Sequence, residues 1–466
     1  MRSLTSVALI LVAAWAPPAA LAATYYVDRS HPAASDSNPG TEALPWLTIQ
    51  HAADTLVAGD TVLVKAGTYP EQVTVASNGA SGQEIVFAAY PGHTVTIDGA
   101  SLSLNEWEGL FQINGGSYIR VTGFHVTNTG PYETNTGIQV DPGSHIVIDG
   151  NHTSYTASSG ILIWGATDVL VDGNEVEHPM TLAADSRNEC ITVGRTSGFE
   201  VRNNHVHDGN PARGEGICAK DGSFSGSVHH NHVHHVPSVG IYVDAWTEHT
   251  HDIDVYANRV HDVDGNGLVV ASEQGGLLES VRLFNNLSYS NLWTGLTISD
   301  CCIESHPMTD IQVLNNSIWG NGLTDWGGGI GNANPQATGL LIRNNAVAGN
   351  LSFEITFEGV DPSGATLDHN LVGEDHGYPD EICGTDCQVG DPLWVDPAAG
   401  DFHLGAGSPA IDHGSATLAP ATDFDGTARP QGAAHDIGAL ESVGAESIFA
   451  DGFESGSTGA WSATFP

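Results

Sequence analysis

Positively charged residues are scarce in this sequence. Its 466 residues include 13 Lys and Arg against 55 Asp and Glu, which leaves a formal net charge of −42 at pH 7. Because nucleic-acid binding depends on clustered Lys and Arg that contact phosphates, this composition excludes a nucleic-acid partner. Only 15% of the residues are charged and 40% are hydrophobic. The chain is therefore not a charged disordered segment, and it can bury a core.

Long hydrophobic runs are also absent beyond the N-terminus. No later stretch approaches the roughly 18 consecutive apolar residues that a membrane span needs, so we expect no span. Arg2 precedes an apolar run from Val7 to Trp15, and Ala20 and Ala22 suit a signal-peptidase site. Residues 1–22 are therefore predicted to be a signal peptide. The mature protein is expected to be secreted, periplasmic or attached to the cell surface.

Cysteine is infrequent, with six residues, and an oxidising compartment would allow these to pair. Cys383 and Cys387 are expected to close a small loop. The pairing of the other four stays open, with buried free thiols as the alternative: Cys190, Cys218, Cys301 and Cys302. None of the spacings is typical of a metal site.

Turn residues, in contrast, are abundant. The 56 Gly and 22 Pro favour many short strands over long helices. Segments such as HIVIDGN, DVLVDGN and GFEVRNN each end in an asparagine, at intervals of 23 to 30 residues. The repeat asparagines are Asn151, Asn174, Asn204, Asn231, Asn258, Asn286, Asn316, Asn345 and Asn370. Such an interval matches one coil of a three-sided parallel β-helix, in which the asparagines are expected to stack and hydrogen-bond.

A second signature, a small residue followed by an aliphatic one, recurs in each repeat. Examples are Gly160-Ile161, Gly216-Ile217 and Gly240-Ile241. One coil cannot bury its own apolar edge, whereas stacked coils build a continuous core. Two registers that repeat together therefore predict an all-β fold, a single-stranded parallel β-helix. The repeated segments resemble the coils of right-handed, pectin-lyase-like β-helices, which implies the same handedness and type here.

The two ends of such a solenoid need covers. Ile49, Ala52, Ala53 and Leu56 have a helical spacing that suits a short N-terminal capping helix over the first coil. Together with the segment VKAGTYPE, this start resembles that of secreted right-handed β-helix proteins, and SPAIDHG with DFDGTARPQGAAHDIGALE resembles their closing segment. The predicted domains are the β-helix with both caps over residues 23–445 and a C-terminal tail over residues 446–466. The tail is similar to sorting or attachment segments of exported bacterial proteins.

Outward-facing charged residues gather on adjacent coils. Aligning the coils on the small residue places Lys220 beside Asp244, with Arg195, Asp221 and Glu273 one or two residues further along. These side chains are the first candidates for catalysis.

Another column stacks Glu189 on Glu215. Two carboxylates one coil apart repel each other unless a cation or a shared proton lies between them. Five basic residues fall on the same two coils: Arg187, Arg195, Arg202, Arg213 and Lys220. On so acidic a chain, this patch predicts a site for an anionic ligand, with Arg187, Arg195 and Arg213 as substrate-binding residues. The alternative is a purely structural pairing of Lys220 with Asp221 or Asp244.

A more specific resemblance rests on RNECITVG, GEGICAKDG and VGIYVDAW on successive coils. These segments resemble the active-site coils of calcium-dependent β-helix polysaccharide lyases of the alginate lyase and chondroitinase B type. The resemblance implies that Lys220 removes the proton beside a uronate carboxylate, which Ca²⁺ held by glutamates, here Glu189 and Glu215, neutralises. Those lyases place an arginine one coil after the lysine, where this sequence has Asp244. Pectate lyases of related shape combine a lysine with calcium-binding aspartates, which would accommodate Asp221 and Asp244 as further ligands.

The predicted reaction is therefore cation-assisted β-elimination of an acidic, uronate-containing polysaccharide by a monomer. Arg195 is expected to stabilise the charge that develops on the uronate, and Tyr242 to protonate the leaving oxygen. The ring of Trp246, just past the strand, is expected to stack on a sugar.

Two other functions stay open. A glycoside hydrolase needs two carboxylates about 5 to 9 Å apart, and Asp244 with Asp221 or Glu273 on adjacent coils would supply them. A non-catalytic glycan-binding or surface solenoid is the other alternative.

Histidines form a column of their own. His207, His234 and His261 each follow the repeat asparagine by three residues, and Glu177 precedes them on the previous coil. Stacked imidazoles could hold a transition metal. Because the histidine recurs as part of the repeat itself, the sequence favours a turn-supporting role over a metal site.

Overall fold

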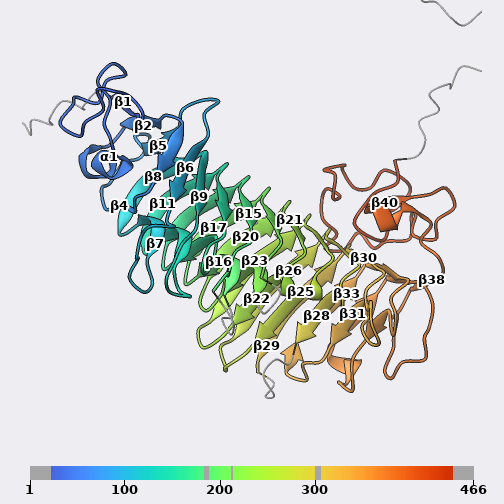
Figure 1. Ribbon diagram of the computed structural model, residues 1–466. Coiled ribbons are helices and arrows are strands. Elements are labelled where there is room, and N and C mark those ends of the chain that lie inside the picture. Colours follow the sequence, from blue (N-terminus) through green and yellow to red (C-terminus); the bar gives the residue numbers. More distant parts are fainter. Residues whose placement is uncertain (1–21, 183–187, 211–213, 300–305, 444–466) are drawn as a thin grey trace, which may run out of the picture.

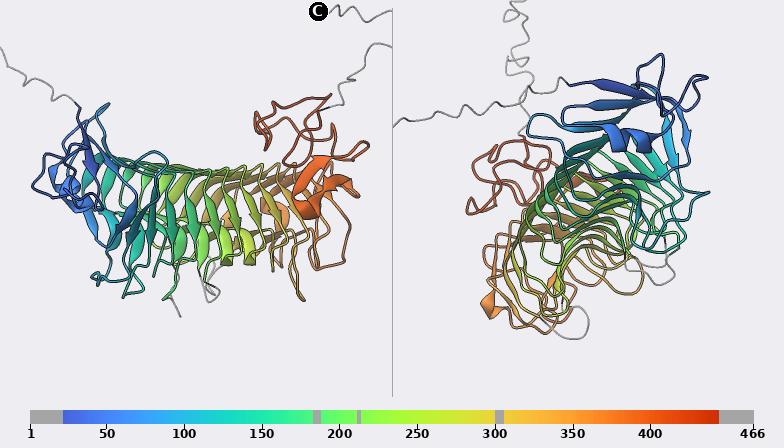
Figure 2. Two further views of the ribbon diagram at one scale, coloured as in Figure 1. Left: turned by 45° about the horizontal axis from the view of Figure 1, so that its top comes forward. Right: turned by 90° about the vertical axis from the view of Figure 1, so that its left-hand side faces the viewer.

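The computed structural model describes residues 22–182, 188–210, 214–299 and 306–443. Over these residues the backbone winds coil after coil into one elongated solenoid, from the N-terminal end to the last strands (Figure 1, Figure 2). Strands of successive coils pair in parallel, in the order of the sequence, in three long sheets. The predicted all-β right-handed parallel β-helix is therefore confirmed.

Each coil contributes one strand to each sheet. The 14-stranded sheet contains β1 (Thr24–Val27), β2 (Thr61–Val64), β5 (Ile85–Ala89), β8 (Gly116–Thr122), β11 (Gly143–Asp149), β14 (Thr167–Asp172), β17 (Ser197–Arg202), β20 (Phe224–His229), β23 (Thr250–Tyr256), β26 (Leu278–Phe284), β29 (Met308–Leu314), β32 (Ala337–Thr338), β33 (Leu341–Arg343) and β36 (Thr366–Asp368). The 11-stranded sheet contains β4 (Val73–Val75), β7 (Gly109–Ile113), β10 (Thr136–Val140), β13 (Ile161–Trp164), β16 (Glu189–Gly194), β19 (Glu215–Lys220), β22 (Pro237–Ala245), β25 (Asp264–Ser272), β28 (Leu296–Ser299), β31 (Ile330–Asn332) and β35 (Ile355–Thr356). The 13-stranded sheet contains β3 (Gly67–Tyr69), β6 (Val95–Asp98), β9 (Phe124–Thr127), β12 (His152–Ser154), β15 (Glu175–Glu177), β18 (His205–His207), β21 (His232–His234), β24 (Arg259–His261), β27 (Leu287–Tyr289), β30 (Ser317–Trp319), β34 (Ala346–Ala348), β37 (Leu371–Val372) and β38 (Gln388–Val389).

The core fills the inside of the coils because alternate strand residues point inward. In the 11-stranded sheet, Ile191, Ile217 and Ile241 lie in register on neighbouring strands and are buried. A small residue precedes each of these isoleucines because the chain packs tightly at the adjacent corner of the coil. A Cβ atom at Gly216 would lie 2.6 Å from Cγ1 of the core residue Val233, so a larger residue would not fit.

The repeat asparagines form the predicted ladder at the corner between the 14- and 13-stranded sheets. The backbone N–H and the Nδ2 group of Asn204 both donate to Oδ1 of Asn231, at 3.0 Å each. Nδ2 of Asn231 in turn donates to the carbonyl of Val201 at 2.9 Å and to Oδ1 of Asn258 at 3.0 Å. This pattern satisfies buried backbone groups at a bend where sheet pairing cannot reach them.

Replacing one rung should destabilise the solenoid. In Asn231→Ala, the buried N–H and Nδ2 of Asn204 lose their acceptor, and each buried group left unpaired costs about 1–3 kcal/mol. We expect urea unfolding to show a loss of about 2–5 kcal/mol. The exposed Asn78, outside the ladder, is the matched control, and Asn78→Ala should change stability by less than about 0.5 kcal/mol. Equal effects of the two substitutions would contradict the ladder's role.

A single α-helix occurs in the described residues, α1 (Ile49–Thr55), in the segment for which a capping helix is expected. Thr48 caps its N-terminus by accepting from the N–H of His51, and Ile49, Ala52 and Ala53 are buried. Gln50 hydrogen-bonds to the backbone of Thr74 in β4, so the helix packs beside the first strand of the 11-stranded sheet. Its role as a cap stays a prediction.

The last described segment folds back on the outside of the solenoid. It contains the 3₁₀ turn η2 (Pro397–Ala399) and an antiparallel pair, β39 (Trp394–Asp396) with β40 (Asp401–Leu404), while η1 (Pro362–Gly364) precedes β36. Phe402 and Leu440 pack with Tyr289 of β27, on the outer face of the 13-stranded sheet.

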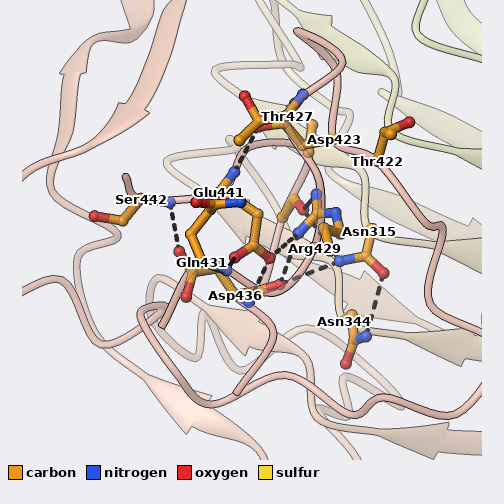
Figure 3. A network of polar contacts seen from close by, with 12 residues as sticks. Asn315, Asn344, Thr422, Asp423, Thr427, Arg429, Gln431, Asp436, Glu441 and Ser442 are labelled. Carbon is orange, nitrogen blue, oxygen red and sulfur yellow. Dashed lines mark hydrogen bonds and ion pairs between the residues drawn. The ribbon is translucent and has the colours of Figure 1, made fainter. Parts of the chain in front are cut away.

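A buried arginine anchors this segment (Figure 3). The guanidinium of Arg429 donates to Oε1 of Glu441 at 2.7 Å, to the carbonyl of Gly438 at 2.8 Å and to Oδ1 of Asn285 at 3.2 Å. Asn315 donates to the carbonyl of Gly438 from the solenoid side. Since removing one partner of a buried ion pair is costly, this network holds the segment firmly.

The predicted disulfide between Cys383 and Cys387 is confirmed. Cys190 and Cys218 are buried free thiols, while Cys301 and Cys302 lie outside the described residues. The predicted signal peptide, apart from Ala22, and the predicted tail also lie outside them. In the described part of the chain, no helix is long and apolar enough to cross a membrane.

Candidate functional site

The candidate residues meet on the outward face of the 11-stranded sheet. Glu189 at the start of β16 is paired with Glu215 at the start of β19, as expected. The pairing of Ala219 with Val243 brings Lys220, at the end of β19, beside Asp244 of β22. We call Glu189, Glu215, Lys220, Asp244 and Glu273 the carboxyl cluster.

Lys220 is the central cation of this cluster. Its Nζ atom lies 2.7 Å from Oε1 of Glu189, with 16% of the lysine side chain and 4% of the glutamate side chain exposed. The second oxygen of Glu189 accepts from Oγ1 of Thr192 at 2.6 Å. Burial acts to lower the pKa of Lys220, but Glu189 and other neighbours outweigh it and raise this pKa above its usual value. Lys220 is therefore an ammonium ion in this structure.

Two other carboxyl groups of the cluster have raised pKa values. Burial raises the pKa of Asp244 to about 8, against the opposing effect of Lys220 and with the support of Glu273. Its Oδ1 atom is buried and has no hydrogen-bond partner. Burial, followed by the charge of Glu189, raises the pKa of Glu215 well above its usual value. The cluster thus combines two carboxyl groups of raised pKa with one ion pair.

Tyr242 and Glu273 form a second part of the site. The hydroxyl of Tyr242 donates to Oε1 of Glu273, which follows β25. Tyr242 also belongs to a small buried apolar group on the outward face, with Cys218 and Val269 among its members. This group lowers the local polarity, which is why a carboxyl such as Asp244 prefers its neutral form.

Arg195 and Asp221 lie together at the turns that follow β16 and β19. Nη2 of Arg195 lies 3.2 Å from Oδ2 of Asp221, and the guanidinium lies 5.6 Å from the ring centre of Trp164. Oδ1 of Asp221 accepts from the N–H groups of Thr247 and Glu248. Half of the Arg195 side chain, 51%, is exposed, so it presents a positive charge beside an aromatic ring. Arg195 and the ring of Trp164 are together suited to bind a sugar that carries a carboxylate.

The residues predicted to bind calcium do not converge. Asp221 faces Arg195, whereas Glu189 faces Lys220 and Thr192. Among the described residues, no group of three potential ligand atoms within 4.8 Å of one another includes Glu189, Glu215 or Asp221. Lys220 forms its ion pair with Glu189. The structural pairing of Lys220 with Asp221, which the sequence left as an alternative, is not the one found.

The remaining predicted residues are only partly placed. Trp246 directly follows β22 and is 48% exposed, as a stacking residue would be. Arg187 and Arg213 lie outside the described residues.

Sequence reasoning missed Thr192 and Cys218. Both lie in the same outward column as Tyr242, and Sγ of Cys218 is 3.9 Å from Oδ2 of Asp244. The repeat alignment contained this column, but neither residue carries charge, so composition offered no reason to select them.

Comparison with known proteins shows the family. The sequence model described as "Pel9A-like, right handed beta helix region" matches residues 25–327, more than half of the chain. The uncharacterized protein YwoF of Bacillus subtilis strain 168 is 26% identical over 432 residues, which cover 81% of this chain and 91% of YwoF.

Two pectate lyases are also similar. Pectate lyase PEL9 of Emericella nidulans is 34% identical over 127 residues, which cover 25% of this chain and 30% of that protein. The crystal structure of pectate lyase Pel9A superposes with a TM-score of 0.55 at 16% identity, over 90% of this chain and 96% of that one. At this identity the superposition shows a shared fold. The chain belongs to the Pel9A-like right-handed β-helix family.

Proposed function

We propose that this protein is an exported carbohydrate-active enzyme that cleaves an acidic polysaccharide at the carboxyl cluster. The observation that carries the proposal is Asp244, a carboxylic acid with a pKa raised to about 8 and an unpartnered Oδ1 atom. Such a group can donate a proton to a glycosidic oxygen at neutral pH. Because Asp244 is only 3% exposed, substrate must displace side chains on the outward face to reach it.

Within this class, we propose β-elimination, as in a polysaccharide lyase. Family membership and the similarity to a pectate lyase over 25% of the chain support this choice. Arg195 on Trp164 would bind the uronate carboxylate, and Asp244 would protonate the leaving oxygen. The sequence suggested Tyr242 for the protonation of the leaving oxygen, but its hydroxyl donates a hydrogen bond to Glu273.

Lys220 remains the proposed base, with one condition. An ammonium cannot remove a proton, and Glu189 is the neighbour that most favours the ammonium form. Lys220 acts as the base only in a state in which Glu189 has released it, since release lowers the pKa of Lys220. Calcium dependence, implied by the resemblance, stays a proposal, and we assign no step to the ion.

Hydrolysis is a second candidate, and the charge of Glu273, which acts on Asp244, favours it. Asp244 is the neutral acid, and Glu273, held by the Tyr242 hydroxyl, would be the carboxylate on the other side of the bond. In this reaction Lys220 is not a base, which agrees with its raised pKa.

A digestion panel separates these functions. Pectate, alginate, chondroitin and a neutral glycan are incubated with the protein, with and without Ca²⁺, and both ultraviolet absorbance of unsaturated ends and new reducing ends are measured. We expect both signals to rise together with a uronate polymer. New reducing ends without unsaturated ends would indicate hydrolysis. Saturable binding without either product would replace the enzyme proposal with a glycan-binding function.

A further inference from the structure

A cluster of histidines covers the outer face of the 13-stranded sheet. Two outward columns run in register over β15, β18, β21 and β24. We call the following residues the histidine face: Glu175, His205, His207, His232, His234 and His261. The expected column of Glu177, His207, His234 and His261 is confirmed by this register. The face belongs to a different sheet from the carboxyl cluster, so it is a separate feature of the solenoid.

Donor atoms of the histidine face lie close enough to share one ion. One ring nitrogen each of His205, His232 and His234 lie within 4.8 Å of one another. A carboxylate oxygen of Glu175 and ring nitrogens of His205 and His207 form a second such group. His205 is common to both groups. Nε2 of His205 is 2.8 Å from Nε2 of His234, so one of these two nitrogens donates a hydrogen bond and the other accepts it.

The surroundings of His207 point to a cation. Nδ1 of His207 lies 2.9 Å from the carboxylate of Asp208, which can only accept, so this nitrogen carries the proton. In the neutral ring, Nε2 then bears a lone pair, yet it faces Oε1 of Glu175 at 3.4 Å. Two acceptors in this arrangement need a second proton or a cation between them. Two ligands each about 2.0–2.1 Å from a tetrahedral Zn²⁺ ion are about 3.4 Å apart.

The carboxylate of Asp208 orients the His207 ring, as carboxylates commonly do for histidine ligands of metals.

We propose that the histidine face binds one divalent transition-metal ion of the Zn²⁺ or Cu²⁺ class, with His205 as a ligand, together with His207 and Glu175. Imidazole nitrogens with one carboxylate suit these ions, whereas Ca²⁺ and Mg²⁺ prefer oxygen ligands throughout. Two other donor groups share these ligands, His232 and His234 with His205, and His152 and Glu177 with Glu175, so the three groups compete for one ion rather than hold three.

Zn²⁺ titration tests this site directly. Tag-free protein is dialysed against EDTA and then against buffer, and binding is measured by calorimetry, with Cu²⁺ electron paramagnetic resonance as a spectroscopic readout of nitrogen ligation. We expect saturation at one ion per chain. His205→Ala should abolish this binding, and Asp208→Asn should weaken it by about 10–100-fold, because the orientation of His207 is lost.

Controls keep the result interpretable. His125→Ala changes a histidine of the same sheet that belongs to none of the three donor groups, so Zn²⁺ binding should be unchanged. Should His205→Ala unfold, as circular dichroism would show, Glu175→Gln removes a half-exposed carboxylate and replaces it in the comparison. Glu175→Gln should then weaken binding at least tenfold. No saturable binding by the unaltered protein, or equal binding by the ligand variants, would overturn the proposal.

Discussion

Asp244→Asn is expected to lose activity and to gain stability at alkaline pH. Asparagine keeps the shape of the side chain but cannot donate a proton as an acid, so kcat/KM should fall by about 10²–10⁴-fold. The pH profile of the unaltered protein should itself change slope near pH 8, where Asp244 ionises. Polysaccharide cleavage measured between pH 5 and 10 checks both effects.

The stability effect has a definite sign. The pKa of Asp244 rises from 3.8 to about 8 on folding, so the folded state holds a proton that the unfolded state has lost between these pH values. The unaltered protein therefore loses stability as the pH rises through this window, by about 1.4 kcal/mol per pKa unit of difference. Asp244→Asn removes this dependence. Chemical unfolding at pH 5 and pH 8 should show the variant gaining relative to the unaltered protein at the higher pH.

Asp141→Asn is the matched control, since Asp141 directly follows β10 of the same sheet but is exposed. It should leave cleavage nearly unchanged, and it should alter the pH dependence of unfolding less than Asp244→Asn, although burial also raises the pKa of Asp141. If Asp244→Asn kept full activity, Asp244 would not be the proton donor. If its stability showed no difference between the two pH values, Asp244 would not be a buried neutral acid.

The second large effect concerns the ion pair of Lys220 with Glu189. Lys220→Met leaves the carboxylate of Glu189 buried without its cation, which should cost about 3–5 kcal/mol in the free energy of unfolding. Adding Glu189→Gln removes the stranded charge, so the double variant should recover most of this loss. A double-mutant cycle by urea unfolding measures the coupling.

Activity in the same variants separates structure from chemistry. The double variant should stay inactive although it is stable, because the proposed base is missing. Glu189→Gln alone should lower the pKa of Lys220 and move the ascending limb of the pH profile to lower pH. If Glu189→Gln lowers the activity but leaves the pH profile where it was, Lys220 is not the base and hydrolysis is favoured.

The other lysine of the chain supplies the control. Lys65 pairs with Glu42 at 2.8 Å, but 53% of the Glu42 side chain is exposed. Lys65→Met should therefore change stability by less than about 1 kcal/mol, as for other surface ion pairs. A comparable loss at Lys65 and Lys220 would mean that burial of the Glu189 pair is not what makes it strong.

The sequence by itself determined the architecture and the stacking order. In a solenoid each coil contacts its neighbours, so aligning repeats also aligns residues in space. This is why the asparagine ladder, the pairing of Glu189 with Glu215 and the histidine column of His207, His234 and His261 could all be predicted from spacing. The small residue at each corner could also be recognised in the sequence. The valine that leaves no room for a larger residue, such as Val233 beside Gly216, comes from another sheet.

Only the tertiary structure decided which charges meet and which protons they hold. Long side chains run along the sheet, so Lys220 reaches Glu189 near the opposite end of the strand pair, whereas Asp221 turns to Arg195. The repeat period describes backbone positions and contains no information on these directions. Burial likewise depends on everything packed around a group, and it is burial that raises the pKa of Asp244 and lowers that of His232.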